Sequence, residues 1–398
     1  MMTLNIQNAN IVLPDEVLEN ASLTVEDGVI SRIDGGASGG YKIDANGAYL
    51  LPGMIDIHSD HIEQEMEPRA GSVMDISFAL HEQERQLINN GITTIYQSLS
   101  LWKASGKQRA SREAAFQEKV IGEIVNAAKS ARLITHRLHL RFDILNLDII
   151  PSLTDMLNKG YVSLLSFMDH TPGQGQYRDL EKHRAYIKSI NPAVSDAEIN
   201  ERLEARMRAE KVPQEKLIDI AKLAKSMGVS IASHDDDSSQ KVDFVSGMLQ
   251  ATISEFPVEL DVARYAKKSG MATLGGAANI MLGKSHSGNL SAAEGILDGS
   301  VTMMCSDYYP PSMLQAVFKL HREYGMPLHE CVKLATLTPA KAVGIDETVG
   351  SIEEGKQADL ILVDASDEYP KLITAVTKGN VSSMLNYSKK TASLQGAR

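Results

Sequence analysis

The chain has 398 residues, of which 43% are hydrophobic and 23% are charged, and its formal net charge is -11 at pH 7. This length and composition suffice for a large core together with a second, small domain. The negative charge argues against nonspecific binding to nucleic acid or to acidic membranes, because both would repel the chain. An anionic small-molecule substrate is not excluded, since local cations and metals outweigh a distant net charge.

Cysteine usage and the N-terminal sequence bear on the compartment. Cys305 and Cys331 are the only cysteines, so no disulfide framework is expected and a reducing compartment fits. The N-terminal stretch MMTLNIQNANIVLPDEV lacks the basic and apolar regions of a secretory signal. No apolar run reaches membrane-spanning length. We therefore expect a cytoplasmic protein. Its oligomeric state is not readable from the sequence, and a homo-oligomer is one option.

Both ends of the chain carry strand patterns. Residues 1–51 contain short runs in which apolar and polar residues alternate, with Asp27-Gly28 as a hairpin signal between two of them. Residues 349–398 contain the apolar run Leu360 to Val363 after a turn. We predict that these two segments pair into one small β-sandwich domain.

Strand-like runs alternate with amphipathic helical segments through residues 52–348, which predicts the second domain. The runs lie near residues 54, 91, 137, 162, 229, 253, 271 and 301, and helical segments such as IGEIVNAAKSARL and LIDIAKLAKSMG lie between them. Eight alternations over roughly the ~250 residues typical of such a fold predict a (β/α)8 barrel of the α/β class. In that fold the chemistry lies at the carboxyl ends of the strands.

Residues 173–215 interrupt this alternation. They are dense in Arg, Lys, Asp and Glu and contain few large apolar residues. One interpretation is a solvated helical insertion. The other is a lid over the active-site face, because the segment directly follows the end of a predicted strand.

The segment LPGMIDIHSDH, residues 51–61, is the most informative motif. A Pro-Gly pair precedes a short apolar strand that ends in His58 and Asp60. Side chains two residues apart on a strand lie on the same face, so these two can converge on one ion. Imidazole and carboxylate are ordinary zinc ligands. We predict a divalent metal site with one or two ions, zinc as the first choice and manganese or iron as alternatives.

Most of the other predicted strands also end in ionisable residues. Together with His58 and Asp60, the candidate metal ligands are Asp143, His234, Glu255 and Asp307. Asp307 is also a candidate catalytic residue that takes a proton from an activated water. His170 is the second candidate catalytic residue. The acidic residues that follow His234 have an alternative interpretation as a helix N-cap.

Several basic side chains lie in segments that are suited to binding anions. The candidate substrate-binding residues are Arg69, Arg141, Arg178, Lys284 and His286. Lys284 and His286 belong to a glycine-containing segment, residues 275–289, whose backbone amides can cradle phosphates. The alternative for such glycines is an ordinary flexible loop. Arg141 alternates with His139 and Asp143, so the three are expected to form an inward-facing polar column on one strand.

Taken together, these motifs resemble the amidohydrolase superfamily. The matching features are PG-x-ID-x-H on the first strand, a histidine on the fifth, an aspartate on the eighth and the terminal GSIEEGKQADLILVD. Within the superfamily, the ordered motifs HSDH, RLHLRFD, MDHTPGQ, ASHDDD, EFP, GKSHSGN and SDYYP resemble diphosphatases of phosphonate metabolism. This resemblance implies metal-dependent hydrolysis of a ribose triphosphate within its phosphate chain, with release of diphosphate.

Two departures from the superfamily pattern leave the number of metals open. Asp60 replaces the usual second histidine of the first strand, and no lysine ends the fourth strand. By analogy with related deacetylases, the resemblance implies that Asp143 can bridge two metals in place of that lysine. Glu255 stands where many relatives have the sixth-strand histidine.

Two other functions are alternatives to a diphosphatase. A cyclic-amide hydrolase or deaminase on the same scaffold predicts a more apolar pocket with little need for Lys284 and Arg178. A non-catalytic barrel scaffold that has lost its metal is the alternative from another class. The presence of the set His58, Asp60, His234 and Asp307 argues against that scaffold.

Overall fold

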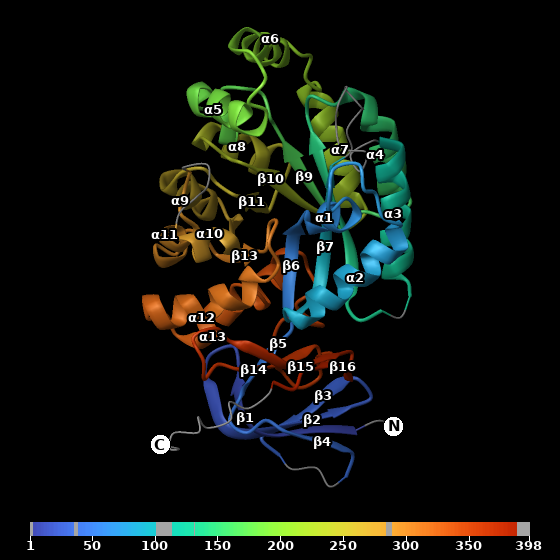
Figure 1. Cartoon of the computed structure of the whole chain (residues 1–398), viewed down its shortest axis with the longest axis vertical. Helices are drawn as coiled ribbons and strands as arrows, with labels where there is room; N and C mark the ends of the chain where they lie inside the picture. Colours follow the sequence, from blue (N-terminus) through green and yellow to red (C-terminus); the bar gives the residue numbers. More distant parts are fainter. Residues whose placement is uncertain (1–2, 36–38, 101–113, 131, 284–288, 388–398) are drawn as a thin grey trace, which may run out of the picture.

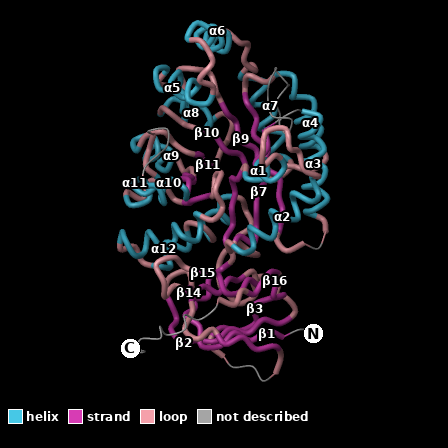
Figure 2. Tube along the Cα trace, in the orientation of Figure 1, coloured by secondary structure: helices cyan, strands magenta, loops and turns pink. Residues whose placement is uncertain are grey.

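The computed structural model describes residues 3–35, 39–100, 114–130, 132–283 and 289–387. It contains two eight-stranded sheets, a barrel and a smaller sheet that lies below the barrel in Figure 1. Figure 2 shows helices flanking the barrel strands and the strand-rich small sheet beneath them. Within these ranges, no helix combines the length and the apolar character needed to cross a membrane.

Eight parallel strands form the barrel, and each pairs with the next one along the chain. They are β6 (Met54–Ser59), β7 (Ile92–Ser100), β8 (Thr135–Asp143), β9 (Leu164–Met168), β10 (Ser230–His234), β11 (Ile253–Glu255), β12 (Ala272–Gly276) and β13 (Met303–Cys305). All eight strand regions predicted from the sequence are confirmed.

The barrel closes between β13 and β6 through residues that were predicted as site residues. Asp60 N donates to Asp307 O at 3.0 Å, and Asp307 N donates to His58 O at 3.1 Å. These bonds hold the ends of the first and last barrel strands together. The predicted (β/α)8 architecture is confirmed, and its closing seam brings together candidate ligands that are far apart in the sequence.

Helices surround the barrel and bury the outward faces of its strands. They are α1 (His61–Met66), α2 (Ile76–Asn89), α3 (Ala114–Ala128), α4 (Ile150–Asn158), α7 (Gln214–Ser226), α8 (Ser239–Gly247), α9 (Leu260–Lys268), α10 (Ala277–Leu282), α11 (Ala292–Leu297), α12 (Ser312–Tyr324), α13 (Leu328–Lys333) and α14 (Leu337–Ala342). On β8, Leu138, Leu140 and Phe142 share one buried cluster with residues of the surrounding helices. Because side chains alternate along a strand, His139, Arg141 and Asp143 of β8 face the barrel interior.

The segment 173–215 contains a one-turn 3-10 helix, η3 (Gly175–Tyr177), and two helices, α5 (Leu180–Ile190) and α6 (Asp196–Met207). Another 3-10 turn, η2 (Leu147–Ile149), precedes α4. In Figure 1, α5 and α6 lie at the end of the barrel opposite the small sheet. The predicted helical character of the insertion is confirmed, and its function as a lid stays a prediction.

Strands from both termini build the small domain, as predicted. They are β1 (Thr3–Val12), β2 (Val17–Glu26), β3 (Val29–Ile33), β4 (Tyr41–Asp44), β5 (Tyr49–Pro52), β14 (Leu360–Asp364), β15 (Lys371–Thr377) and β16 (Asn380–Met384). The strands of the expected β-sandwich all belong to one hydrogen-bonded sheet, because β1 pairs with β2 and also with β4 and β5. The Asp27-Gly28 hairpin is confirmed, with φ of 50° and 87°.

The Pro52-Gly53 pair connects the two sheets. Gly53 N donates to Asp359 O at 2.8 Å, and a Cβ added at Gly53 would lie 2.2 Å from Thr93 Oγ1. Only glycine therefore fits this close approach to β7. Since β5 ends at Pro52 and β6 begins at Met54, we propose the predicted division into a small domain, 1–51 with 349–398, and a barrel, 52–348.

Candidate active site

A cavity of ≈ 460 Å³ opens at the carboxyl ends of the barrel strands. One part of its wall is polar and includes Asp60, Arg141, His234 and Asp307. Another part is apolar and includes Phe256, Leu274 and Leu290. The cavity therefore combines several of the residues predicted from strand ends with an apolar surface that can contact a small organic molecule.

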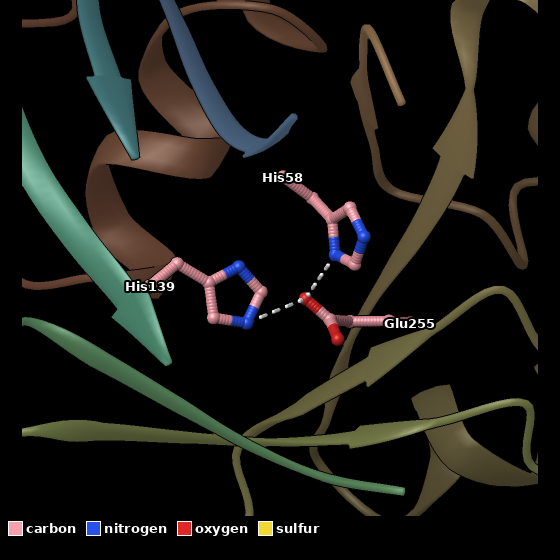
Figure 3. A group of neighbouring side chains, drawn as sticks. All are labelled: His58, His139 and Glu255. Atoms are coloured by element: carbon pink, nitrogen blue, oxygen red, sulfur yellow. Dashed lines mark hydrogen bonds and ion pairs between the residues drawn. The ribbon is translucent and has the colours of Figure 1, made fainter. Parts of the chain in front are cut away.

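The first ligand-like group lies beside this cavity and comes from three strands. His58 on β6 and His139 on β8 both point toward Glu255 on β11 (Figure 3). His58 Nδ1 is 3.0 Å from Glu255 Oε1, and His139 Nε2 is 3.7 Å from the same oxygen. All three residues are buried, and their ligand atoms lie within 4.8 Å of one another. This group has the chemistry to hold a metal ion.

The two imidazoles of this group are neutral. Burial, followed by the nearby Arg141 guanidinium, holds the pKa of His58 well below its usual value. Burial also lowers the pKa of His139 to about 3, although Glu255 opposes that shift. A neutral imidazole has one nitrogen lone pair, so it can coordinate a metal or accept a hydrogen bond.

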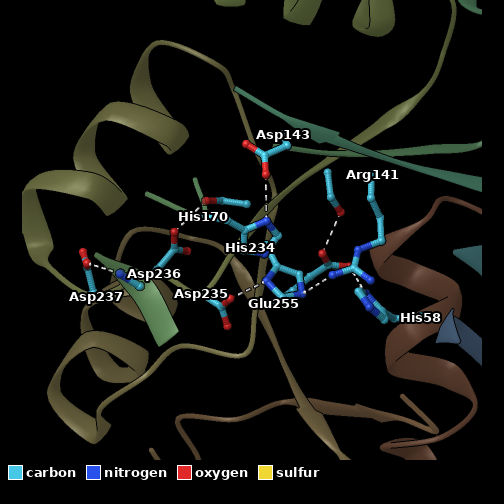
Figure 4. Close-up of polar contacts among 12 residues, drawn as sticks. His58, Arg141, Asp143, His170, His234, Asp235, Asp236, Asp237 and Glu255 are labelled. Atoms are coloured by element: carbon cyan, nitrogen blue, oxygen red, sulfur yellow. Dashed lines mark hydrogen bonds and ion pairs between the residues drawn. The ribbon is translucent and has the colours of Figure 1, made fainter. Parts of the chain in front are cut away.

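A second group consists of His170, His234 and Asp235, whose ligand atoms also lie within 4.8 Å of one another. Figure 4 shows Arg141 pointing toward His234, and the Arg141 Nη2 to His234 Nε2 distance is 3.4 Å. His234 Nδ1 is 2.9 Å from Asp235 Oδ2. His170 Nδ1 is 2.8 Å from Asp143 Oδ2. Two predicted residues of this region, Asp143 and His170, are thus in direct contact.

Asp235 was not selected as a site residue from the sequence, where the acidic run was weighed against a helix N-cap. The N-cap of α8 is Ser238, whose side chain accepts from Lys241 N. Asp236 accepts from the hydroxyls of Ser233 and Ser254. The acidic residues after His234 therefore have different partners, and Asp235 is the one that lines the cavity.

Left-handed backbone conformations occur where three barrel strands end. Asp235, Phe256 and Asp307 have φ of 53°, 54° and 59°. Residues other than glycine rarely adopt such φ values, although aspartate does so more often than most. Residues in these conformations cluster at functional sites. Each of these residues lines the cavity, so the unusual backbone lies at the candidate active site.

Excess negative charge at the closing seam fits a bound cation. Burial, followed by the charge of Asp60, raises the pKa of Asp307 to about 7. A divalent ion between these carboxylates would remove that repulsion. His58 and His234 supply nitrogen donors nearby, with their ring centroids 5.4 Å apart. His61 begins α1 and has its Nε2 3.6 Å from Glu65 Oε1 in the same helix.

The remaining predicted substrate-binding residues are placed differently. Arg69 is exposed and lies in a turn with Ser72. Arg178 pairs with Glu259, with 2.5 Å between Nη1 and Oε1. Neither arginine is among the residues that line the cavity. Lys284 and His286 lie outside the described residues.

Comparison with known proteins finds a matching family and similar proteins of full length. A model described as the amidohydrolase family matches residues 49–389. The chain is 33% identical over 370 residues to alpha-D-ribose 1-methylphosphonate 5-triphosphate diphosphatase from Escherichia coli (strain K12), a match that covers 92% of this chain and 96% of that protein. It is 22% identical over 390 residues to an imidazolonepropionase from Picrophilus torridus, covering 90% of this chain and 89% of that protein.

Among solved structures, N-acetylglucosamine-6-phosphate deacetylase from Pasteurella multocida matches with a TM-score of 0.65 and 14% identity. That match covers 96% of this chain and 99% of the deacetylase, and it shows the fold alone. The family model, by contrast, covers most of the sequence. The chain therefore belongs to the amidohydrolase family.

Proposed function

We propose that this protein is a metal-dependent diphosphatase that hydrolyses alpha-D-ribose 1-methylphosphonate 5-triphosphate and releases diphosphate. The observation that carries the proposal is the 33% identity to the Escherichia coli enzyme of that name along almost the whole of both chains. The cavity supports it, because cationic Arg141 lines it together with three of the candidate metal ligands, Asp60, His234 and Asp307.

The metal site in this proposal is built on the closing seam and on β10. His58, Asp60, His234 and Asp307 would hold the ion, while Asp143 and Glu255 lie against His170 and His58. A bound divalent ion activates water and neutralises phosphate charge. The donor set, imidazole nitrogens with carboxylate oxygens, suits zinc, and also manganese or iron.

The protein's own groups would handle the proton and the charge. Asp307, which lines the cavity beside Asp60, accepts a proton from the attacking water. His170, held by Asp143 at 2.8 Å, passes a proton to the departing diphosphate. Arg141 binds phosphate oxygens, because its Nε is buried and has no hydrogen-bond partner among the described residues.

The predicted anion-binding loop extends the same proposal. Leu282 and Asn289, which flank the segment 284–288, both line the cavity. We propose that Lys284 and His286 of that segment contact the triphosphate. Lys284→Ala should then raise KM for triphosphates more than for neutral substrates. An equal change in KM for both classes would contradict this role.

A substrate panel tests the proposed function. Enzyme loaded separately with zinc, manganese and ferrous iron is given ribose 5-triphosphates with and without a 1-methylphosphonate, nucleoside 5'-triphosphates, and a set of cyclic amides and aminated heterocycles. We expect diphosphate release from the methylphosphonate sugar to be the fastest reaction. Faster turnover of a cyclic amide or a deamination would favour the alternative hydrolase or deaminase. Absence of all turnover together with substoichiometric metal would favour the scaffold.

We also propose that the protein acts in the cytoplasm. Both cysteines are free and buried, which fits a reducing compartment. The small-molecule substrate proposed above is consistent with that location.

A further inference from the structure

His139 is completely buried, and each of its ring nitrogens has a partner. Nδ1 lies 2.9 Å from Ser98 Oγ, and Nε2 lies 2.6 Å from Ser166 Oγ. Ser98 Oγ also accepts the backbone N–H of Ser59 at 3.0 Å. Although His139 belongs to a group of residues with metal-binding chemistry, an imidazole engaged at both nitrogens has no lone pair left for an ion.

Counting donors and acceptors fixes the direction of these bonds. Ser166 has one hydroxyl hydrogen, and its Oγ is 2.6 Å from Glu255 Oε2. A carboxylate can only accept, so Ser166 donates to Glu255. His139 Nε2–H must then donate to Ser166 Oγ. The remaining nitrogen of neutral His139, Nδ1, accepts from the Ser98 hydroxyl.

The other oxygen of Glu255 extends the network to His58. Glu255 Oε1 is 3.0 Å from His58 Nδ1, and because the carboxylate accepts, His58 Nδ1–H donates. The lone pair of neutral His58 is therefore on Nε2. Figure 3 shows both imidazoles converging on Glu255 from different strands. Every hydrogen bond of the network is thus assigned without a conflict.

We propose that this network is a positioning relay that fixes the tautomer of His58 and presents its Nε2 as a metal ligand. The relay consists of Ser98, His139, Ser166 and Glu255. It rests on the proposed metal-dependent function, and it assigns Glu255 to the support of His58 in place of the direct coordination expected from the sequence. Carboxylates that accept the second N–H of a metal-binding histidine orient the ring and raise its basicity.

Nitrogen-15 NMR of the histidine rings in the full-length protein tests the relay directly. We expect His139 to carry its proton on Nε2 and His58 on Nδ1 in the metal-free protein. Addition of zinc alone should shift the signal of His58 Nε2 and leave both nitrogens of His139 unchanged. A proton on Nδ1 of His139, or a zinc-dependent shift at its Nε2, would overturn the relay.

Zinc affinity, measured by competition with a chromophoric chelator, tests the role of Glu255. Outer partners of metal-binding histidines typically contribute about 10- to 100-fold to affinity. We therefore expect Glu255→Gln to weaken zinc binding within about that range, clearly less than His58→Ala. Ser166→Ala should weaken it less than Glu255→Gln. Ser300→Ala, at another buried serine, is the matched control and should leave affinity unchanged. A loss in Glu255→Gln equal to that in His58→Ala would identify Glu255 as a direct ligand.

These measurements separate the relay from the proposed function, because neither uses a substrate. Correct tautomers with no diphosphate release in the substrate panel would remove the diphosphatase assignment alone. Diphosphate release by a protein whose His139 carries its proton on Nδ1 would remove the relay alone.

Discussion

Asp307 contributes to the candidate site in three ways. Its backbone N–H and C=O close the barrel against β6, its φ of 59° is left-handed, and its carboxyl lines the cavity. Burial and Asp60 raise the pKa of this carboxyl to about 7. This raised pKa belongs to the metal-free protein; with a cation bound, the Asp307 carboxylate is placed to accept a proton from water in the cavity. The backbone contribution does not depend on the side chain's charge.

Asp307→Asn should therefore separate catalysis from folding. We expect kcat to fall by about 10²-fold or more, the usual contribution of a positioned proton acceptor. The melting temperature of the metal-free protein should not fall, because the backbone bonds remain and a buried, repelled carboxyl is removed. Asp298→Asn, at a residue paired with Arg264 outside the cavity, is the control. Near-normal kcat in Asp307→Asn would exclude the proton-acceptor role.

At the scale of residues, the sequence predicted strand-end positions better than pairings. Alternation on β8 correctly predicted that His139 faces inward. It could not show that Ser98 and Ser166 occupy both nitrogens of that ring, because those contacts join three strands. The sequence did not identify Asp235 as a site residue for a different reason. Several adjacent acids carry the same local signal, and only the tertiary fold determines which one reaches the cavity.

The α5–α6 segment contacts the candidate site through α6. Arg206 Nη2 lies 3.9 Å from Asp143 Oδ2, which is itself in contact with His170. Upstream, the ring of Tyr177 stacks on His183 of α5 with 4.0 Å between centroids. Tyr177 also lies 6.0 Å from the ring of His170. These contacts place Arg206, an exposed cation of the insertion, beside the residues that would handle the phosphates.

Arg206→Ala tests the predicted lid role. We expect KM for the triphosphate substrate to rise about tenfold, consistent with the ~1.5–3 kcal/mol typical of a hydrogen bond to a charged group. The value of kcat should change much less. Arg202→Ala is a matched control on the same helix, because Arg202 pairs with Glu198 one turn away. If both variants behave alike, Arg206 has no specific role in substrate binding.

At the scale of elements, hydrophobic periodicity predicted the barrel strands because each buries an apolar outer face against helices, as Leu138 and Leu140 do. The same reasoning identified the Asp27-Gly28 hairpin, which depends on local turn chemistry alone. The position of α6 could not be predicted this way. Its contact with the site depends on one long side chain, Arg206, which reaches a strand far away in the sequence.

The two sheets meet where the chain crosses from β5 to β6, and this junction is chemically specific. Ile361 and Val363 of β14 share a buried cluster with Val317 of α12, so the small sheet packs on the outer helices of the barrel. Asp359 lies at the junction, and its backbone oxygen accepts from Gly53 N. The strand patterns predicted that the two termini pair. No sequence pattern predicted that Asp359 would be buried where they contact the barrel.

Asp359 should make stability depend on pH. Its carboxyl is buried and accepts from Lys378 N at 2.7 Å and from Gln357 Nε2 at 3.0 Å. Burial raises its pKa above the usual 3.8, although these hydrogen bonds oppose the shift. The folded state therefore holds a proton that the unfolded state has released. The unfolding free energy then falls as pH rises from about 4 through the folded-state pKa.

Asp359→Asn removes this titration, so the variant should gain stability relative to the wild type as pH rises through that window. Melting temperatures of both proteins, measured across the same pH series, give the difference with other titrations cancelled. Asp364→Asn is an opposite control on β14, since hydrogen bonds from Ser366 lower the pKa of Asp364. That variant should lose a little stability relative to the wild type as pH rises. A pH-independent difference for Asp359→Asn would show that this carboxyl does not titrate differently in the folded and unfolded states.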